Sequence, residues 1–431
     1  MPNPDYESHT TRSKQLYESA KSVLPGGTAY QIRYFEPYPF QASRAKGSRI
    51  FDADGNEFID YWCTHFALIL GHSHPKVVEA LKEQIPNGYH FGVPHEREIK
   101  LAELVAKTVP SARMVRFTNS GTDANMYAVR LARTYTKREK IGKFEGNWHG
   151  GYDALHVAVH PPFDGPQSGG LPADNARHTI VLPYNDLDGA RKKIRDHQLA
   201  CVLVEPVMGG GGMIPAEKDF LQGLREVCDE SGALLIFDEV VTGYRLGLGG
   251  AQQFYGVLPD ITVLGKILGG ALPIGAIAGR KDIMEHLDQT KYQGEELSFI
   301  GGTGIGNALS MAAGVATLEE LMRTNPYPEL ERLGQKAREG LRQAFGRAGI
   351  DVQITGVGST FGCHFNKQPI KSMRDVARND VKLAQRFHRT LLDNGVFMLT
   401  PHTLHGCIST AHNSEDIVKL IAVAERFARM G

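Results

Sequence analysis

Residues 233–239 read Ala-Leu-Leu-Ile-Phe-Asp-Glu, a short apolar run that ends abruptly in two carboxylates. An uninterrupted apolar run of this length is typical of a strand buried on both faces, as in a parallel sheet covered by helices. Helical stretches such as 220–231 separate this run from other strand-like segments, at 114–118, 180–182, 202–204, 261–264 and 274–277. The alternation predicts an α/β fold with a mostly parallel sheet.

The pattern changes after about residue 308. Long charged helices are expected over 326–348 and 375–394, with short strands near Phe361 and Ile408. We therefore predict a smaller α+β domain made from both chain ends, beside a large α/β domain. This division assigns residues 1–75 and 311–431 to the smaller domain and 76–310 to the large one. A Pro- and Gly-rich stretch, 162–175, is expected to be a surface loop, with a lid as the alternative.

The composition excludes several classes of protein. The 431 residues are 42% hydrophobic and 22% charged, as in ordinary globular proteins. Because 48 basic residues balance 48 acidic ones, nucleic-acid binding is not expected. The longest apolar runs, such as 66–70, are far shorter than the roughly 20 residues of a membrane span, and the polar N-terminus lacks a secretion signal. Five widely spread cysteines fit reducing cytoplasm, so we expect a cytoplasmic protein without a membrane partner.

Two polar features follow predicted strands, where an α/β sheet binds ligands. Ser120, Gly121 and Thr122 connect the strand at 114–118 to a helix. Backbone N–H groups at a helix start, together with two hydroxyls, suit a phosphate, although such a serine is also an ordinary helix cap. Asp238 ends a buried strand, where a carboxylate needs either a cationic ligand or a salt bridge or helix cap.

Two further features complete a possible site. Lys266 lies among apolar and glycine residues in the stretch 264–270. Desolvation would lower the pKa of its amine and make it a nucleophile for a Schiff base, whereas a snorkelling surface lysine is the alternative. Trp148 could stack on a flat cofactor or fill the core. A phosphate cradle, a strand-end carboxylate, an aromatic ring and a lysine are together the parts of a pyridoxal 5'-phosphate site.

These features belong to motifs that resemble the class III aminotransferases, which are pyridoxal-phosphate enzymes of fold type I. Within that family the resemblance is strongest to the glutamate-1-semialdehyde aminomutases. It runs over nearly the whole chain, through LPGG at 24–27, FDADG at 51–55, LGHSHP at 70–75, RFTNSGT at 116–122, KFEG at 143–146, EPV at 205–207, DEVVTGYR at 238–245 and PDITVLGK at 259–266. The resemblance implies a large domain with a mostly parallel seven-stranded sheet.

The resemblance also implies roles for individual residues. Lys266 would form the Schiff base with pyridoxal phosphate, and Asp238 would hold the pyridine nitrogen. Val240 would pack on the ring face opposite Trp148, and Glu205 would have a supporting role. The phosphate would be held by Ser120, Gly121 and Thr122. Gly302 and Thr303 match a pair whose threonine reaches the phosphate of the neighbouring subunit, which implies a homodimer with active sites at the interface.

The substrate residues depart from the aminomutase pattern. Arg33 matches an arginine that grips a substrate carboxylate, a task that suits a guanidinium. Tyr30 replaces a small hydroxyl residue, and His405 stands about where the aminomutase has a glutamate that handles amino groups. We therefore predict an aminotransferase that moves an amino group from a β- or ω-amino acid to a keto acid. The alternative is the intramolecular aminomutase reaction, while a racemase, a decarboxylase or a catalytically idle cofactor-binding protein is also compatible with these residues.

Overall fold

The computed structural model describes residues 5–164, 167–172, 174–399 and 402–430. Pro75–Tyr327 and Lys371–Ala377 form the larger of two compact units, and the remaining described residues form the smaller. The larger unit extends past the predicted boundary at residue 310, because helix α11 (Ala308–Thr324) packs on α4 (Pro75–Gln84) and α5 (Glu96–Thr108). Residues 165, 166 and 173 of the predicted loop or lid lie outside the described residues.

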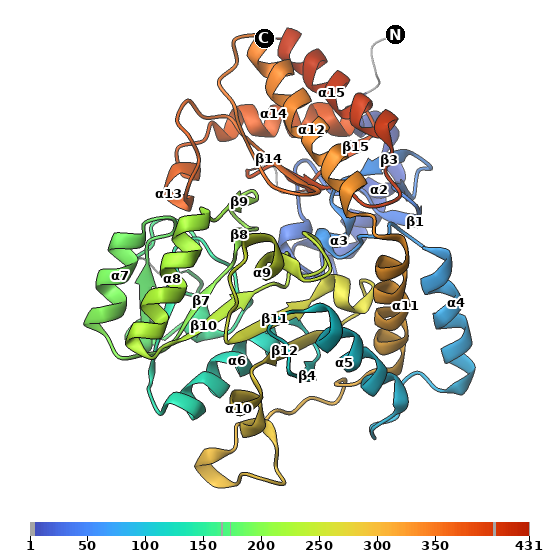
Figure 1. Ribbon diagram of the computed structural model, residues 1–431. Helices are drawn as coiled ribbons and strands as arrows, with labels where there is room; N and C mark the ends of the chain where they lie inside the picture. The colour runs from blue at the N-terminus through green and yellow to red at the C-terminus, as the bar shows by residue number, and fades with distance from the viewer. Residues whose placement is uncertain (1–4, 165–166, 173, 400–401, 431) are drawn as a thin grey trace. The chain divides into compact units, whose positions relative to one another are not determined.

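The larger unit is built on a seven-stranded sheet in the order β4-β12-β11-β10-β7-β5-β6 (Figure 1). Only β12 runs antiparallel to its neighbours. The strands span Met114–Thr118 (β4), Lys140–Phe144 (β5), Thr179–Leu182 (β6), Leu199–Val204 (β7), Leu234–Asp238 (β10), Ile261–Gly265 (β11) and Gly275–Gly279 (β12). The predicted α/β fold with a mostly parallel seven-stranded sheet is confirmed.

Burial explains which strands could be predicted. Every residue of β7, β10 and β11 is buried, which explains why these strands are almost entirely apolar, with Asp238 at the end of β10 and Thr262 within β11 as the polar exceptions. Side chains of helix α6 (Gly121–Thr136), including Ala128, Val129 and Leu131, pack with them in one hydrophobic cluster. Strand β5 was not predicted, because two lysines interrupt its apolar pattern. One of them, Lys143, is nonetheless fully buried.

The smaller unit contains a four-stranded sheet, β1-β2-β3-β15, and a three-stranded sheet, β13-β14-β16. These strands span Ala42–Lys46 (β1), Arg49–Asp52 (β2), Glu57–Asp60 (β3), Gln353–Thr355 (β13), Thr360–His364 (β14), Val396–Phe397 (β15) and His405–Cys407 (β16). Its main helices are α12 (Tyr327–Arg347), α14 (Val381–Asp393) and α15 (Ser414–Arg429). The predicted helix over 375–394 is wrong at its start, because α13 (Met373–Val376) ends before α14 begins. Asp380 caps the new helix by accepting a 2.9 Å hydrogen bond from the Leu383 backbone N–H.

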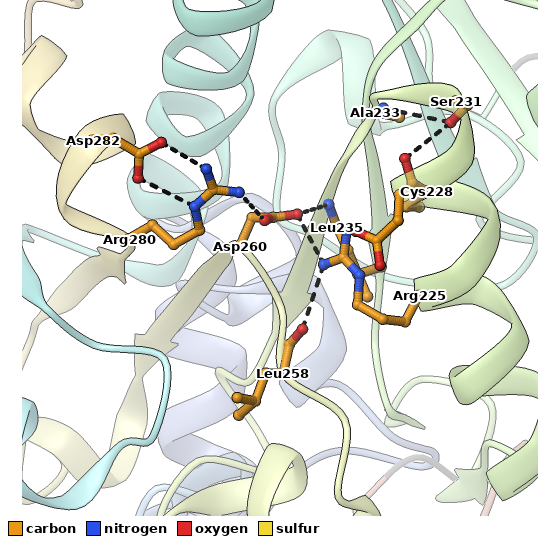
Figure 2. A network of polar contacts seen from close by, with 10 residues as sticks. Arg225, Cys228, Ser231, Ala233, Leu235, Leu258, Asp260, Arg280 and Asp282 are labelled. Atoms are coloured by element: carbon orange, nitrogen blue, oxygen red, sulfur yellow. Dashed lines mark hydrogen bonds and ion pairs between the residues drawn. The ribbon is translucent and has the colours of Figure 1, made fainter.

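A polar network fastens the amino-terminal edge of the large sheet (Figure 2). Asp260 directly precedes β11 and is buried. Its Oδ2 accepts hydrogen bonds from Arg225 at 2.9 Å and from the Leu235 backbone at 2.8 Å, while its Oδ1 accepts from Arg280 at 2.8 Å. The carboxylate thus ties helix α8 (Lys218–Ser231) to β10, β11 and the end of β12.

In the part of the chain that the structure describes, none of the helices is both long and apolar enough to cross a membrane.

Candidate cofactor and active site

The carboxyl-terminal ends of five strands of the large sheet carry the predicted cofactor residues. Strand β12 runs against its neighbours, and its first residue, Gly275, pairs with both Thr118 of β4 and Gly265 of β11. These strands therefore end at the same edge, as do the parallel strands β5, β7 and β10. The residues that follow or end them are Ser120, Trp148, Glu205, Asp238 and Lys266. Open α/β sheets bind ligands at this edge.

Asp238 ends β10 as a buried carboxylate held by neutral groups. Its Oδ2 accepts hydrogen bonds from Asn125 Nδ2 at 2.8 Å and from His149 Nδ1 at 2.7 Å. Its Oδ1 accepts one from the Val240 backbone at 3.0 Å. Burial lowers the pKa of His149, against the opposing effect of Asp238, so the imidazole is neutral and donates through Nδ1–H.

Lys266 follows β11 in a backbone conformation that side chains seldom adopt. Its φ is +49°, in the left-handed region, directly after the extended Gly265. Such a conformation costs a non-glycine residue about 1–2 kcal/mol and tends to occur at functional sites. Burial lowers the pKa of Lys266, while the nearby carboxylates of Asp238 and Glu205 oppose that shift. A desolvated amine beside two acids is suited to nucleophilic and proton-transfer chemistry.

Glu205 joins the end of β7 to the turn that carries Trp148. Its Oε1 accepts a 2.6 Å hydrogen bond from the Trp148 backbone N–H, and its Oε2 accepts a 3.0 Å bond from Gly209. Burial, followed by the charge of Asp238, raises the pKa of Glu205. The Trp148 ring is half-buried and meets His156 edge to face, with centroids 5.4 Å apart. Glu205 therefore supports this turn through the backbone.

The predicted phosphate loop starts α6. Ser120 is the N-cap of this helix, since its Oγ accepts a 3.2 Å hydrogen bond from the Asp123 backbone. A Cβ on Gly121 would lie 2.9 Å from Val240 Cγ2, so the loop passes directly against the Val240 side chain. A Cβ on Gly150 would come within 2.2 Å of Thr122 Oγ1. Ser120 therefore caps α6 in the ordinary way, and the loop also passes close to its neighbours. The dipole of this 16-residue helix favours an anion at its N-terminus.

Gly302 and Thr303 lie beside the same loop. A Cβ on Gly302 would be 2.4 Å from Asn119 Nδ2, and one on Gly304 would be 2.8 Å from Asn119 Oδ1. Thr303 itself is exposed. Its predicted reach into a neighbouring subunit stays a prediction.

The chemistry and the polar atoms of this edge fit pyridoxal phosphate. Among the described residues, four buried side-chain atoms here have no hydrogen-bond partner: Asn119 Oδ1, Asn125 Oδ1, Asn147 Nδ2 and His149 Nε2. Buried polar atoms are normally paired, so such a cluster marks a place where a ligand can supply contacts. The phosphate could be held at the α6 N-terminus, the ring nitrogen by Asp238 and the aldehyde carbon by Lys266.

Two contributors, Asn125 and His149, were not assigned a role from the sequence. Both donate to Asp238, from 113 and 89 residues away along the chain. The sequence contains only a weak indication that they belong to this edge: His149 follows Trp148, and Asn125 lies one helical turn after Gly121. Nothing in a single sequence pairs them with Asp238.

The predicted substrate residues belong to the smaller unit. Arg33 ends a 3-10 turn (Gln31–Arg33) and is exposed. Tyr30 is 38% exposed; partial burial raises its pKa, and the charge of Arg33 opposes that rise. His405 lies in β16 (His405–Cys407) and is buried, with its ring stacked on Phe66 at 5.4 Å. Burial lowers the pKa of His405 to about 4. Their substrate roles stay predictions, and residues 400 and 401 beside His405 lie outside the described residues.

Comparison with known proteins identifies the family. The aminotransferase class-III family model matches residues 31–413. A glutamate-1-semialdehyde 2,1-aminomutase from Methanothermobacter thermautotrophicus is 43% identical over 422 residues, which cover 96% of this chain and 98% of that protein. An omega-transaminase from Sphaerobacter thermophilus is 39% identical, with a TM-score of 0.91 and coverage of 97% and 98%. A beta-phenylalanine aminotransferase from Variovorax paradoxus is 32% identical, with a TM-score of 0.89 and coverage of 98% and 94%.

The family match spans most of the chain, and the fold and sheet edge described above agree with it. The chain therefore belongs to the class III aminotransferases and is a pyridoxal-phosphate-dependent enzyme, an aminotransferase or aminomutase, of fold type I.

Proposed function

We propose that this enzyme transfers the amino group of a carboxylate-bearing amine, of the β- or ω-amino acid type, to a keto acid. The observation that carries the chemistry is the placement of Lys266, desolvated and in a strained backbone conformation, with the charges of Asp238 and Glu205 nearby. In family members pyridoxal phosphate supplies an electron sink for the bond that breaks at the amine-bearing carbon. Binding and orienting the cofactor and moving the proton fall to residues of this chain.

Those side chains have distinct tasks in the proposal. Lys266 would hold the cofactor covalently, and its Nζ would take and return the substrate proton. Asp238 keeps a proton on the ring nitrogen. Ser120, Gly121 and Thr122 bind the phosphate at the helix N-terminus. Trp148 and Val240 flank the ring, and Glu205 holds the Trp148 turn.

Arg33 and the pocket residues support an intermolecular reaction. A guanidinium pairs with a carboxylate through two hydrogen bonds, which suits an amino-acid donor. Tyr30 adds apolar bulk, and His405 replaces the aminomutase glutamate. The names of two solved relatives, an omega-transaminase and a beta-phenylalanine aminotransferase, agree with such a donor class.

A second candidate is glutamate-1-semialdehyde 2,1-aminomutase activity, in which one molecule receives its own amino group. The observation in its favour is the name shared by relatives that are 41–43% identical over 96% of this chain. These names favour the second candidate, whereas the substituted pocket residues favour the first.

The deciding experiment adds single amines to the purified, cofactor-loaded enzyme while absorbance follows the bound cofactor. The panel contains α-, β- and ω-amino acids, aryl amines and glutamate semialdehyde. We expect β- or ω-amino acids to convert the cofactor to its amine form, with product released only after a keto acid is added. Turnover of the semialdehyde without any acceptor would establish the aminomutase instead.

A Lys266→Ala variant tests the shared chemistry. We expect turnover to fall by at least about a thousandfold, because the covalent anchor and proton carrier are both lost. Wild-type-like activity would refute the mechanism. A control with Lys137→Ala, on a lysine exposed at the C-terminal end of α6, should keep full activity.

We also propose a cytoplasmic homodimer with small-molecule substrates. Large apolar side chains are exposed on the larger unit, including Tyr89 at 67%, Val93 at 65%, Ile99 at 63% and Phe299 at 70%. A subunit interface would remove such side chains from water, and contiguous apolar surface typically marks an interaction site. Light scattering should give twice the 47.3 kDa chain mass, and a monomeric active enzyme would refute this proposal.

A further inference from the structure

We infer that Lys143 and Glu205 are positioning residues that hold the peptide group between Asn147 and Trp148 from its two ends, and so fix Trp148 in place. The inference deepens the proposed function, because it rests on Trp148 serving as the ring that stacks on the cofactor. It assigns a purpose to two buried ionisable side chains that do not themselves carry out the reaction.

The contacts converge on a single peptide unit. Lys143 Nζ donates a 2.9 Å hydrogen bond to the carbonyl oxygen of Asn147. The N–H on the other side of the same peptide bond, that of Trp148, donates a 2.6 Å bond to Glu205 Oε1. The planar peptide group thus lies between an amine and a carboxyl group, which contact its opposite poles. Rotation of this group would break both bonds at once.

Lys143 and Glu205 need these hydrogen bonds because buried ionisable groups are costly without polar partners. Lys143 and Glu205 are both buried, and neither takes part in a direct ion pair within the described part of the chain. Burial lowers the pKa of Lys143 to about 7, with Glu205 opposing, and raises the pKa of Glu205. Each group is therefore stabilised through the peptide dipole that separates it from the other.

Other contacts anchor the two ends of the clamp. Lys143 Nζ also donates to the Val157 carbonyl at 2.6 Å, and Glu205 Oε2 accepts from Gly209 at 3.0 Å. The Glu205 backbone N–H donates to Asn147 Oδ1 at 2.8 Å. Strand ends β5 and β7 thereby hold the turn from both sides.

The turn needs such support because its flanks are glycines. Gly146 and Gly150 have φ values of +80° and +89°, in the region that glycine enters without strain. Backbone freedom at both flanks would let the Trp148 peptide rotate if nothing fixed it. The clamp removes that freedom before the cofactor arrives, which is preorganisation of the stacking ring.

The test uses the native tryptophans of the chain. Trp62 and Trp148 are the two tryptophans in the sequence, so a Trp62→Phe background leaves Trp148 as the one indole reporter. Lys143→Met and Glu205→Gln are made in this full-length background. The glutamine keeps the shape of Glu205 but turns one of its two acceptors into a donor facing a backbone N–H. It provides a milder variant if Lys143→Met folds poorly.

A matched control is available in Arg138. Its Nη1 also donates to two backbone carbonyls, those of Leu199 at 3.0 Å and Ser231 at 2.9 Å. Arg138→Met removes a cation with the same kind of contacts but does not touch the Trp148 turn. Its stability loss therefore measures the general cost of such a change.

The first readout is acrylamide quenching and anisotropy of Trp148 in the cofactor-free chain. We expect the quenching constant to rise at least about twofold in both clamp variants, with lower anisotropy, and to stay unchanged in Arg138→Met. Unchanged Trp148 quenching in folded Lys143→Met or Glu205→Gln protein would overturn the inference. This readout needs no catalysis, so it is independent of the proposed function.

The second readout is the dissociation constant of pyridoxal phosphate. We expect each clamp variant to weaken binding about tenfold, and the double variant to be little worse than either single one, because both bonds fix the same peptide. Additive losses would overturn the shared clamp. If Trp148 becomes mobile while cofactor binding does not change, the clamp stands and the stacking role of Trp148 in the proposed function fails.

Discussion

Two buried aspartates stand at opposite edges of the large sheet, Asp238 at the end of β10 and Asp260 just before the neighbouring strand β11, and their hydrogen-bond partners are of different kinds. Asp260, at the amino-terminal edge, accepts hydrogen bonds from two arginines (Figure 2). Asp238, at the carboxyl-terminal edge, accepts from the neutral groups Asn125, His149 and the Val240 backbone. One carboxylate is neutralised within the fold, and the other is held in place without a guanidinium.

The two aspartates suggest different tasks for the two edges of the sheet: Asp260 contributes to stability, and Asp238 is the proposed cofactor ligand. A carboxylate neutralised by arginines has little capacity left for a ligand, and removing it leaves buried positive charge. A carboxylate positioned by neutral donors keeps its charge available for a cationic ligand, which is the role proposed for Asp238 toward a protonated ring nitrogen. The same edge also holds the strained Lys266 and several buried atoms without partners among the described residues. Functional edges of this kind commonly sacrifice stability.

The largest expected effect comes from Asp238→Asn. The amide cannot hold a proton on the cofactor nitrogen, so we expect kcat/KM to fall by about a hundredfold to a thousandfold. The free energy of unfolding should change by no more than about 1 kcal/mol, because the partners of Asp238 are neutral. Steady-state kinetics and urea unfolding measure both quantities. Activity within a few fold of wild type would break the functional half of the comparison.

Asp260→Asn should give the reverse pattern. Two arginines would lose their shared carboxylate, and Arg225 is mostly shielded from solvent, with 20% of its side chain exposed. We expect the free energy of unfolding to fall by about 3 kcal/mol. The kcat of the enzyme that remains folded should stay near wild type, since the sheet edge with Lys266 is untouched. A large loss of kcat with unchanged stability would reverse the assignment of the two edges.

The sequence predicts the carboxyl-terminal edge better than the network that holds the fold. Asp238 and Lys266 could be recognised because each ends or follows an apolar run. A charged side chain buried there is costly unless a partner or ligand pairs with it. The partners of Asp260 come from helix α8 and from the residue after β12, so chain distance hides them. Strand β5 was missed because Lys143 looks like a surface residue until its carbonyl partners are known.

Roles that depend on three-dimensional contacts were the hardest to predict. Ser120 is a helix cap as well as a candidate phosphate ligand, and the sequence allowed both. Long-range donors such as Asn125 carry no local pattern. The substrate roles predicted for Tyr30, Arg33 and His405 rest on resemblance, because function depends on the chemistry of a site and cannot be read from the fold alone.

His149→Phe should weaken function to an intermediate degree. The substitution keeps an aromatic ring but removes one of two hydrogen bonds to Asp238 Oδ2, so the carboxylate is held less firmly. We expect kcat/KM to fall about tenfold, together with a shifted pH dependence of the absorbance of the bound cofactor. Asn125→Leu removes the other donor and should act in the same direction. An unaltered absorbance titration in both variants would show that neutral donors do not tune Asp238.

Asp282→Asn should have the smallest effect on the free energy of unfolding. This variant tests whether the exposed end of the Asp260 network contributes to stability. Asp282 accepts a 2.6 Å hydrogen bond from Arg280, but its side chain is 50% exposed. Water therefore screens the pair, and the loss of stability should stay below about 1 kcal/mol.

The hydrogen bond from Arg280 lowers the pKa of Asp282 in the folded protein. The unfolded chain therefore binds the proton first as acid is added, and the stabilisation, present above the ordinary pKa of about 3.9, is lost as the pH falls through the lower folded value. Urea unfolding at pH 7 and near pH 3 should show a smaller wild-type advantage over Asp282→Asn at the lower pH. A loss as large as that of Asp260→Asn would mean that the exposed end of the network, rather than the buried carboxylate, carries its stability.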